Sequence, residues 1–242
     1  MCGRYVSAAP VDDLAKYFSA TTPEHALEAN FNVAPTTGVY AVRANDGERA
    51  LRSMRWGLVP FWAKDLKIGS RMINARSETV ADKPAFRRAF TKRRCLLPAD
   101  GFYEWQKIEG QKAKQPFFIH RVDEEPLVFA GLYEFWHPKD DDGNDVVDAE
   151  VVVSCTILTT AANKTIEPVH DRMPVMLAPG VWDDWLDPAT DLDFVSSLMV
   201  PAPEALLTMY PVSTAVNSVR NRGAELIEEV NREQELTLDL GT

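Results

Sequence analysis

Four extended runs follow one another in the middle of the chain, and they limit the fold more than any other feature of the sequence. They span residues 94–97, 102–107, 116–121 and 127–136. The triplet Glu109-Gly110-Gln111 predicts a hairpin turn between the second and third runs. The β-branched run 151–158 comes next and predicts a strand that is buried on both faces. Strands are therefore expected to dominate the middle of the chain.

Helices are expected nearer to the two ends. Behind Pro10, apolar residues recur at helical spacing at Val11, Leu14, Ala15 and Phe18. A short helix is predicted over residues 84–90, where proline at an early position is acceptable. A third helix is predicted at the helically spaced Trp182, Trp185 and Leu186. Further strands are expected at residues 39–43, 51–56 and 174–177, and irregular segments at 32–37 and 57–65.

The composition favours one soluble domain. The chain has 242 residues, and an apolar share of 45% is enough for a sizeable core. No apolar run approaches the roughly 20 residues of a membrane span, and the first residues do not have the pattern of a secretory signal. We therefore expect a cytoplasmic protein with no membrane partner, associated with the nucleoid if the organism is a prokaryote.

The three cysteines, Cys2, Cys95 and Cys155, are scattered and lack any CxxC spacing. Their odd number and wide separation argue against a disulfide framework and against a zinc cluster. We expect reduced thiols, with Cys95 and Cys155 in the core, and neither a metal nor a cofactor.

The net charge of −10 argues against a protein that meets nucleic acid through bulk electrostatics, but the charge is unevenly distributed. Residues 64–94 hold ten Lys or Arg against three acids, whereas acids gather at residues 140–148 and 225–235. A basic run is most often a solvated face, so this segment permits a polyanionic partner without requiring one.

Cys2 carries the most distinctive chemistry. Removal of Met1 would leave it with a free α-amine and a thiol, whose ordinary pKa values of roughly 7.7 to 8.0 and about 8.5 place both near their reactive forms at neutral pH. The alternative is that position 2 simply holds whatever residue followed the start codon.

Three other residues could support such chemistry. Glu104 lies on a predicted strand whose alternation places Phe102, Glu104 and Gln106 on one face, and a dry face would raise its pKa into the range of a proton shuttle. His170, between two prolines, could act as an acid or a base. Asn74 could hold a substrate oxygen or an amine. The alternatives are an exposed acid, a structural histidine and an amide that closes a turn.

Some residues suit a nucleic acid. Arg4, Arg76 and Arg172 offer planar guanidinium groups that match phosphates, although surface arginines are common. Trp62 could stack on a base or could fill the core.

These motifs occur in the order of a known family. The blocks are Met1-Cys2-Gly3-Arg4-Tyr5, Asn32-Val33-Ala34-Pro35, Trp56-Gly57-Leu58-Val59-Pro60, Ile73-Asn74-Ala75-Arg76-Ser77-Glu78-Thr79, Gly101-Phe102-Tyr103-Glu104-Trp105, His170-Asp171-Arg172-Met173-Pro174, and the segment from Val212-Ser213 to Arg222-Gly223-Ala224-Glu225. Together they resemble the SOS response-associated peptidase (SRAP) family, whose members crosslink to abasic sites in single-stranded DNA.

The resemblance implies an α+β fold: one domain over residues 1–242 around a curved, largely antiparallel β-sheet with a barrel-like core and flanking helices. The family match covers about residues 2–225, and an acidic tail follows to 242. The resemblance also implies that Asn74, Glu104 and His170 surround Cys2. It further implies DNA contacts by Arg4, Asn32, Pro35, Trp62, Arg76, Thr159 and Arg172.

The implied function is to sense abasic sites in single-stranded DNA and to protect them as a thiazolidine crosslink to Cys2, with autoproteolytic removal of Met1. We expect the protein to act as a monomer. Two alternatives remain open: an amide hydrolase of the N-terminal nucleophile type, and a plain single-strand binder that uses Trp62 and the arginines.

Overall fold

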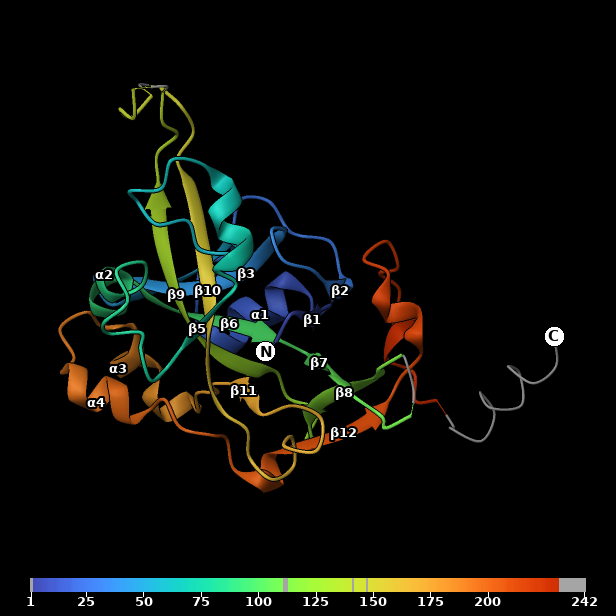
Figure 1. Ribbon diagram of the computed structural model, residues 1–242. Helices are drawn as coiled ribbons and strands as arrows, with labels where there is room; N and C mark the ends of the chain where they lie inside the picture. The colour runs from blue at the N-terminus through green and yellow to red at the C-terminus, as the bar shows by residue number, and fades with distance from the viewer. Residues whose placement is uncertain (1, 111–112, 141, 147, 231–242) are drawn as a thin grey trace.

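The fold is built on two β-sheets with short helices on the outside (Figure 1). The computed structural model describes residues 2–110, 113–140, 142–146 and 148–230. Its strands are β1 (Arg4–Ser7), β2 (Asn30–Val33), β3 (Gly38–Asn45), β4 (Glu48–Trp56), β5 (Asn74–Arg76), β6 (Arg94–Ala99), β7 (Gly101–Gln106), β8 (Gln115–Arg121), β9 (Leu127–Trp136), β10 (Val152–Ala161), β11 (Arg172–Pro174) and β12 (Leu207–Pro211).

The helices are short. The α-helices are α1 (Val11–Phe18), α2 (Arg87–Lys92), α3 (Trp182–Leu186) and α4 (Leu192–Ser197). The 3₁₀ helices are η1 (Leu66–Arg71), η2 (Pro179–Val181), η3 (Glu204–Leu206), η4 (Thr214–Asn217) and η5 (Ala224–Ile227). No helix in the described part of the chain has the length and apolar character needed to span a bilayer.

The larger sheet closes on itself. Its strands follow the order β11-β10-β4-β3-β6-β9, and β9 pairs again with β10, so that five strands form a ring. The smaller sheet, of order β12-β8-β7-β1-β2, is antiparallel throughout. Parallel pairing occurs where β10 meets β4 and β5. The expected α+β fold with a barrel-like, largely antiparallel core is therefore confirmed.

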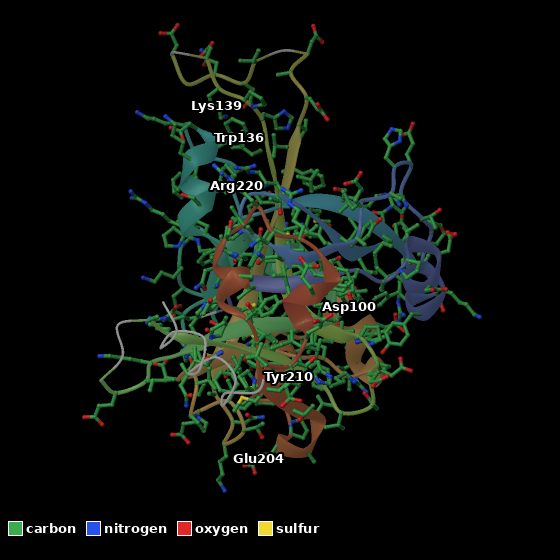
Figure 2. The ribbon with its side chains drawn as sticks, turned by 90° about the vertical axis from the view of Figure 1, so that its right-hand side faces the viewer. Asp100, Trp136, Lys139, Glu204, Tyr210 and Arg220 are labelled. Carbon is green, nitrogen blue, oxygen red and sulfur yellow. The ribbon has the colours of Figure 1, made fainter. Side chains whose placement is uncertain are left out.

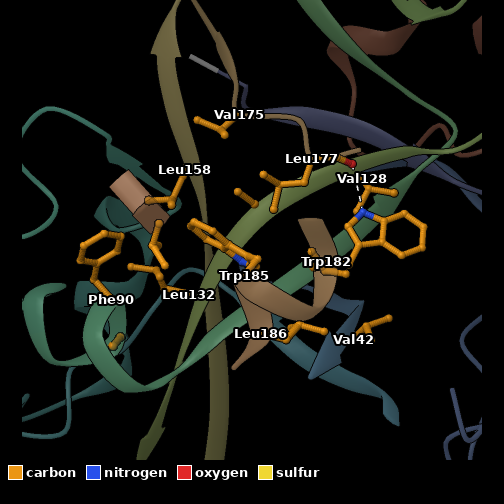
Figure 3. Close-up of a cluster of buried hydrophobic side chains, with 14 of the residues drawn as sticks. Val42, Phe90, Val128, Leu132, Leu158, Val175, Leu177, Trp182, Trp185 and Leu186 are labelled. Carbon is orange, nitrogen blue, oxygen red and sulfur yellow. Dashed lines mark hydrogen bonds between the residues drawn. The ribbon is translucent and has the colours of Figure 1, made fainter. Parts of the chain in front are cut away.

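Apolar side chains fill two main layers, one on each face of the ring. On one face, α1 to α4 cover the ring strands, and Figure 3 shows Trp185 within this cluster while the indole of Trp182 donates to the carbonyl of Leu177 at 3.0 Å. On the other face, Trp56 and Phe129 of the ring contact Tyr5 of the smaller sheet edge-on. Cys95 and Cys155 lie in this second layer, as the sequence predicts.

The outer face of the smaller sheet is covered by the C-terminal segment. Tyr103 and Phe118 on this face pack with Val212, Val216 and Leu226. Figure 2 shows the orange-red segment crossing in front of the sheet, with Tyr210 and Arg220 labelled. Phe102 lies instead in the layer between the sheets, so the predicted alternation along β7 is confirmed.

Most predicted elements form. The helix at 11–18, the strands at 39–43, 51–56 and 151–158, the four extended runs and the helix at Trp182 are all present. The irregular segment 57–65 contains no helix or strand. β7 and β8 pair as the predicted hairpin, although Gln111 of its turn lies outside the described residues.

Three boundaries were predicted wrongly. Residues 32 and 33 belong to β2, because β1 offers them an antiparallel partner that a single-sequence pattern does not reveal. The helix predicted at 84–90 begins at Arg87, after a series of turns that Pro84 opens. The strand predicted at 174–177 is β11 at 172–174, since its pairing with β10 ends there and Met176 forms only an isolated bridge.

The acidic segment lies at one tip of the molecule. Lys139 forms an ion pair with Asp145 beyond the ends of β9 and β10, and Figure 1 shows this tip projecting at the top. Val152 and Thr159 of β10 are seven residues apart, which is about 23 Å along a strand. The acids of this tip are therefore far from the end of β10 that pairs with β11. Asp141, residue 147 and the tail beyond 230 lie outside the described residues.

Gly101 is expected to be essential for stability because the chain passes from one sheet to the other there. A Cβ at this position would lie 2.3 Å from the Phe118 ring and 2.8 Å from the Ile119 carbonyl oxygen. Gly101→Ala should lower the free energy of unfolding by about 1 to 3 kcal/mol, the range of an overpacked core. Urea unfolding measures the change. Gly180→Ala, whose Cβ would meet nothing within 4 Å, is the control and should stay within about 0.5 kcal/mol; equal effects of the two variants would contradict the argument.

Candidate active site

Cys2 lies just before β1, where the two sheets meet. Its side chain is fully buried. Asn74 Nδ2, from β5 of the larger sheet, donates a hydrogen bond of 2.8 Å to the carbonyl oxygen of Cys2. This bond joins the start of the smaller sheet to the larger one. Met1 lies outside the described residues.

Glu104 approaches Cys2 through the pairing of β1 with β7. Arg4 pairs with Tyr103, so the next residue of β7 lies beside the residues that precede β1. The Glu104 side chain is only 3% exposed, which excludes the solvated acid considered from the sequence. Burial raises the pKa of Glu104. Burial also raises the pKa of the Cys2 thiol, and the charge of Glu104 raises it further, so the thiol stays protonated at neutral pH.

His170 faces the same region from the loop between β10 and β11. Its Nδ1 accepts a hydrogen bond of 2.9 Å from the backbone N–H of Arg172, which leaves the proton of the neutral ring on Nε2. Burial lowers the pKa of His170, and Lys114 and Arg172 add to this, whereas Asp171 opposes it. Asp171 Oδ1, 2.9 Å from Nδ1, forms an ion pair only with the protonated ring. Because the pKa is lowered, the neutral ring is the main form at pH 7.

Arg76, Thr159 and Arg172 come together at the end of β10. Thr159 pairs with Arg76 on β5. Arg172 holds the carboxylate of Glu78 with two hydrogen bonds of 2.6 and 3.0 Å and donates to the Thr159 carbonyl at 2.6 Å. Hydrogen bonding to Arg172 lowers the pKa of Glu78. The guanidinium expected to bind a phosphate therefore already holds a carboxylate.

Arg4 and Asn32 contact a C-terminal loop. Arg4 donates to Asn32 Oδ1 at 2.8 Å and to the Val216 carbonyl at 3.0 Å. The Asn32 side chain is 1% exposed, and its Nδ2 lies within 3.1 Å of the carbonyl oxygens of Val216, Ser218 and Asn221. Because Asn32 and Thr159 are both buried, direct contact between their side chains and DNA stays a prediction.

Trp62 projects from the irregular segment that follows β4. It is 48% exposed, so the core-filling alternative is wrong. Gly57 starts this segment at φ +118°, and a Cβ there would lie 2.5 Å from the Gly69 carbonyl, so glycine allows the two segments to approach. The guanidinium of Arg88 lies 4.5 Å above the exposed Phe61 ring. Pro35, half-buried, lies in the turn after β2.

Sequence reasoning gave no role to three residues that support the site. Lys114 is exposed on the β7–β8 hairpin, and its charge lowers the pKa of both Glu104 and His170. Gln106 donates to the Pro168 carbonyl at 3.0 Å and so links β7 to the His170 loop. Asn163, 8% exposed, donates to the Ala202 carbonyl at 2.9 Å and accepts from the Ile166 amide at 3.1 Å. Lys114 and Gln106 could have been suspected because they flank the predicted hairpin whose first strand carries Glu104.

The arrangement combines a buried thiol with a carboxyl whose pKa is raised by burial and an imidazole whose pKa is lowered by burial. Within the described ranges no group of three or more His, Cys, Asp or Glu side chains is placed to hold a metal ion. The site can therefore support nucleophilic chemistry at residue 2, assisted by an acid and a base.

Several known proteins are similar to this chain. The abasic site processing protein YoqW of Bacillus subtilis (strain 168) is 40% identical over 231 residues, which is 94% of this chain and 99% of that protein. The abasic site processing protein YedK of Escherichia coli (strain K12) is 32% identical over 239 residues, which is 95% of this chain and all of that protein.

A solved structure of a protein from Bacteroides thetaiotaomicron shares the fold. Its TM-score is 0.81 at 22% identity, over 95% of this chain and all of that one. The family described as SOS response associated peptidase (SRAP) matches residues 1–219, which is most of the sequence. The chain therefore belongs to the SOS response associated peptidase (SRAP) family.

Proposed function

We propose that this protein processes abasic sites in single-stranded DNA by joining the lesion to the α-amine and thiol of Cys2 after removal of Met1. Relatives that match nearly the whole chain are named for abasic-site processing. The observation that carries the proposal is the hydrogen bond from Asn74 Nδ2 to the Cys2 carbonyl. It holds the residue that would bear the amine between the two sheets, beside the buried Glu104.

The reaction begins with the ring-opened deoxyribose, which exposes an aldehyde at C1′. The neutral amine nitrogen of Cys2 forms a bond to this carbon, and the carbonyl oxygen leaves as water to give an imine. The thiol sulfur then bonds to the same carbon, and its proton ends on the nitrogen. The product is a thiazolidine, formed with the loss of one water molecule overall.

Each neighbouring side chain has a role in this scheme. The Cys2 thiol keeps its proton because its pKa is raised, so ring closure needs a group that takes this proton and passes it to the nitrogen. Glu104 would be this group, because its charge already acts on the pKa of the thiol. Asn74 Oδ1 is buried with no hydrogen-bond partner in the described part of the chain, which leaves it available to orient the amine. His170 carries its proton on Nε2, from where it would assist sugar-ring opening as an acid and help to reverse the crosslink.

The DNA would lie across the end of β10. Arg4, Arg76 and Arg172 would hold phosphates, and Arg172 would have to exchange the Glu78 carboxylate for one of them. Trp62 would stack on a base, an interaction worth about 1 to 3 kcal/mol. Its exposure also supports the alternative of a plain single-strand binder, which would bind damaged and undamaged strands equally.

Incubation of the purified protein with single-stranded DNA that contains one abasic site should give a heat-stable covalent band. By intact mass, the adduct should equal the DNA plus the chain without Met1, minus one water. An undamaged oligonucleotide of the same sequence should give no band. Non-covalent binding of equal strength to both strands, without any adduct, would support the plain binder instead.

A further inference from the structure

The loop of residues 216–222 turns its backbone carbonyls toward the inside of the protein. Asn32 Nδ2 donates hydrogen bonds to three of these carbonyl oxygens, those of Val216, Ser218 and Asn221, at 3.0 to 3.1 Å. The Phe31 amide donates to the Arg222 carbonyl at 3.1 Å. One buried amide and the neighbouring backbone thus determine the shape of the whole loop.

The outer side of this loop is consequently rich in donors. Arg220 and Arg222 are exposed, and no acid occurs between residues 213 and 222. The backbone amides of Val219, Arg220 and Arg222 donate no backbone hydrogen bond within the described ranges. Guanidinium groups and backbone amides on one exposed loop are the donors that bind phosphate oxygens.

The loop stands directly beside the candidate site. Arg4, two residues from Cys2, reaches its inner side at the Val216 and Asn217 carbonyls. The indole of Trp105, next to Glu104, donates to Asn217 Oδ1 at 2.7 Å. Figure 2 shows Arg220 near the upper end of the loop.

We propose that loop 216–222 is a wall of the DNA groove, that Arg220 and Arg222 bind backbone phosphates of the single strand, and that Asn32 is the residue that positions this wall. The inference rests on the proposed function for the identity of the ligand. It gives buried Asn32 an indirect role, since the side chain acts through the loop that it holds.

The double variant Arg220→Ala, Arg222→Ala tests the inference by binding to an undamaged single-stranded oligonucleotide. Both side chains are exposed, so folding should be unaffected. Binding should weaken roughly tenfold at about 50 mM salt, and the slope of log K against log salt should become shallower by about 1.4, or about 0.7 for each lost phosphate contact. Replacement of both residues by lysine should restore most of the slope.

The matched control removes two positive charges elsewhere, with Lys16→Ala on α1 and Arg121→Ala at the end of β8. An unchanged slope in the loop variant, an equal loss in the control, or no salt-dependent binding by the wild type would overturn the inference. Because the oligonucleotide is undamaged, failure of the wild type to crosslink abasic DNA would contradict the proposed function without deciding this test.

Discussion

Cys2→Ala is expected to abolish the heat-stable adduct while leaving affinity for undamaged single-stranded DNA largely intact. Alanine keeps the α-amine but has no sulfur to close the ring, so only a reversible imine can form. Denaturing gel electrophoresis with an abasic oligonucleotide measures the loss. When a borohydride reductant is present during the reaction, the variant should again give a band, because reduction traps the imine.

Cys155→Ala is the matched control, because it removes a buried thiol that lies in the layer between the sheets. Its adduct should form as in the wild type. A retained Met1 or an added N-terminal tag places the Cys2 nitrogen in a peptide bond, so no thiazolidine can form and the heat-stable band should be absent without reductant. A heat-stable band that persists in Cys2→Ala without reductant would exclude the thiazolidine mechanism.

Glu104→Gln is expected to slow adduct formation by roughly 10² to 10⁴, the usual contribution of a general acid or base. Because burial raises the pKa of Glu104, the wild-type rate should begin to fall at a pH above the ordinary pKa of a carboxyl group as the pH is lowered. This pH-dependent fall should be absent from the variant. Single-turnover rates across pH measure both effects. Glu109→Gln, an exposed acid on the same hairpin, should match the wild type. A Gln variant with the wild-type rate and pH profile would remove Glu104 from the mechanism.

Glu104→Gln should slow the reaction but raise the stability of the folded protein. A raised pKa in the folded state means that folding favours the protonated carboxyl, so stability is lost as pH rises through that pKa. Glu104→Gln should therefore unfold at a higher temperature than the wild type at pH 8, and the difference should vanish below about pH 4.5.

The intact mass of Glu104→Ala as expressed will show whether the removal of Met1 depends on this carboxyl.

The sequence predicts the strands well because their signal is local. The four extended runs are rich in apolar and aromatic residues, residues 151–158 are rich in β-branched ones, and each becomes a strand. β2 and β5 have no such signal, since each is short and is defined by its pairing with β1 or β10. The pairing of β9 with β10 that closes the ring also joins separate segments of the chain, so no local sequence pattern predicts it.

The site follows the same division. Ordered motifs pointed to Asn74, Glu104 and His170, and the structure brings Asn74 into hydrogen bonding with Cys2 and the charge of Glu104 within reach of its thiol. Their roles in catalysis stay predictions. Motifs could not report that Arg172 is held by Glu78, nor that Arg4 and Asn32 contact residues more than 180 positions away, because these contacts depend on the packed fold.

The acidic tip beyond β9 and β10 lies close to the start of the basic segment of residues 64–94. The indole of Trp136, at the end of β9, donates to the Ala63 carbonyl at 2.7 Å, and Leu66 packs in the same cluster. Charges of both signs therefore lie at this end of the molecule, where the acids of the tip oppose the attraction that the basic segment exerts on a polyanion. Raising the ionic strength weakens both effects.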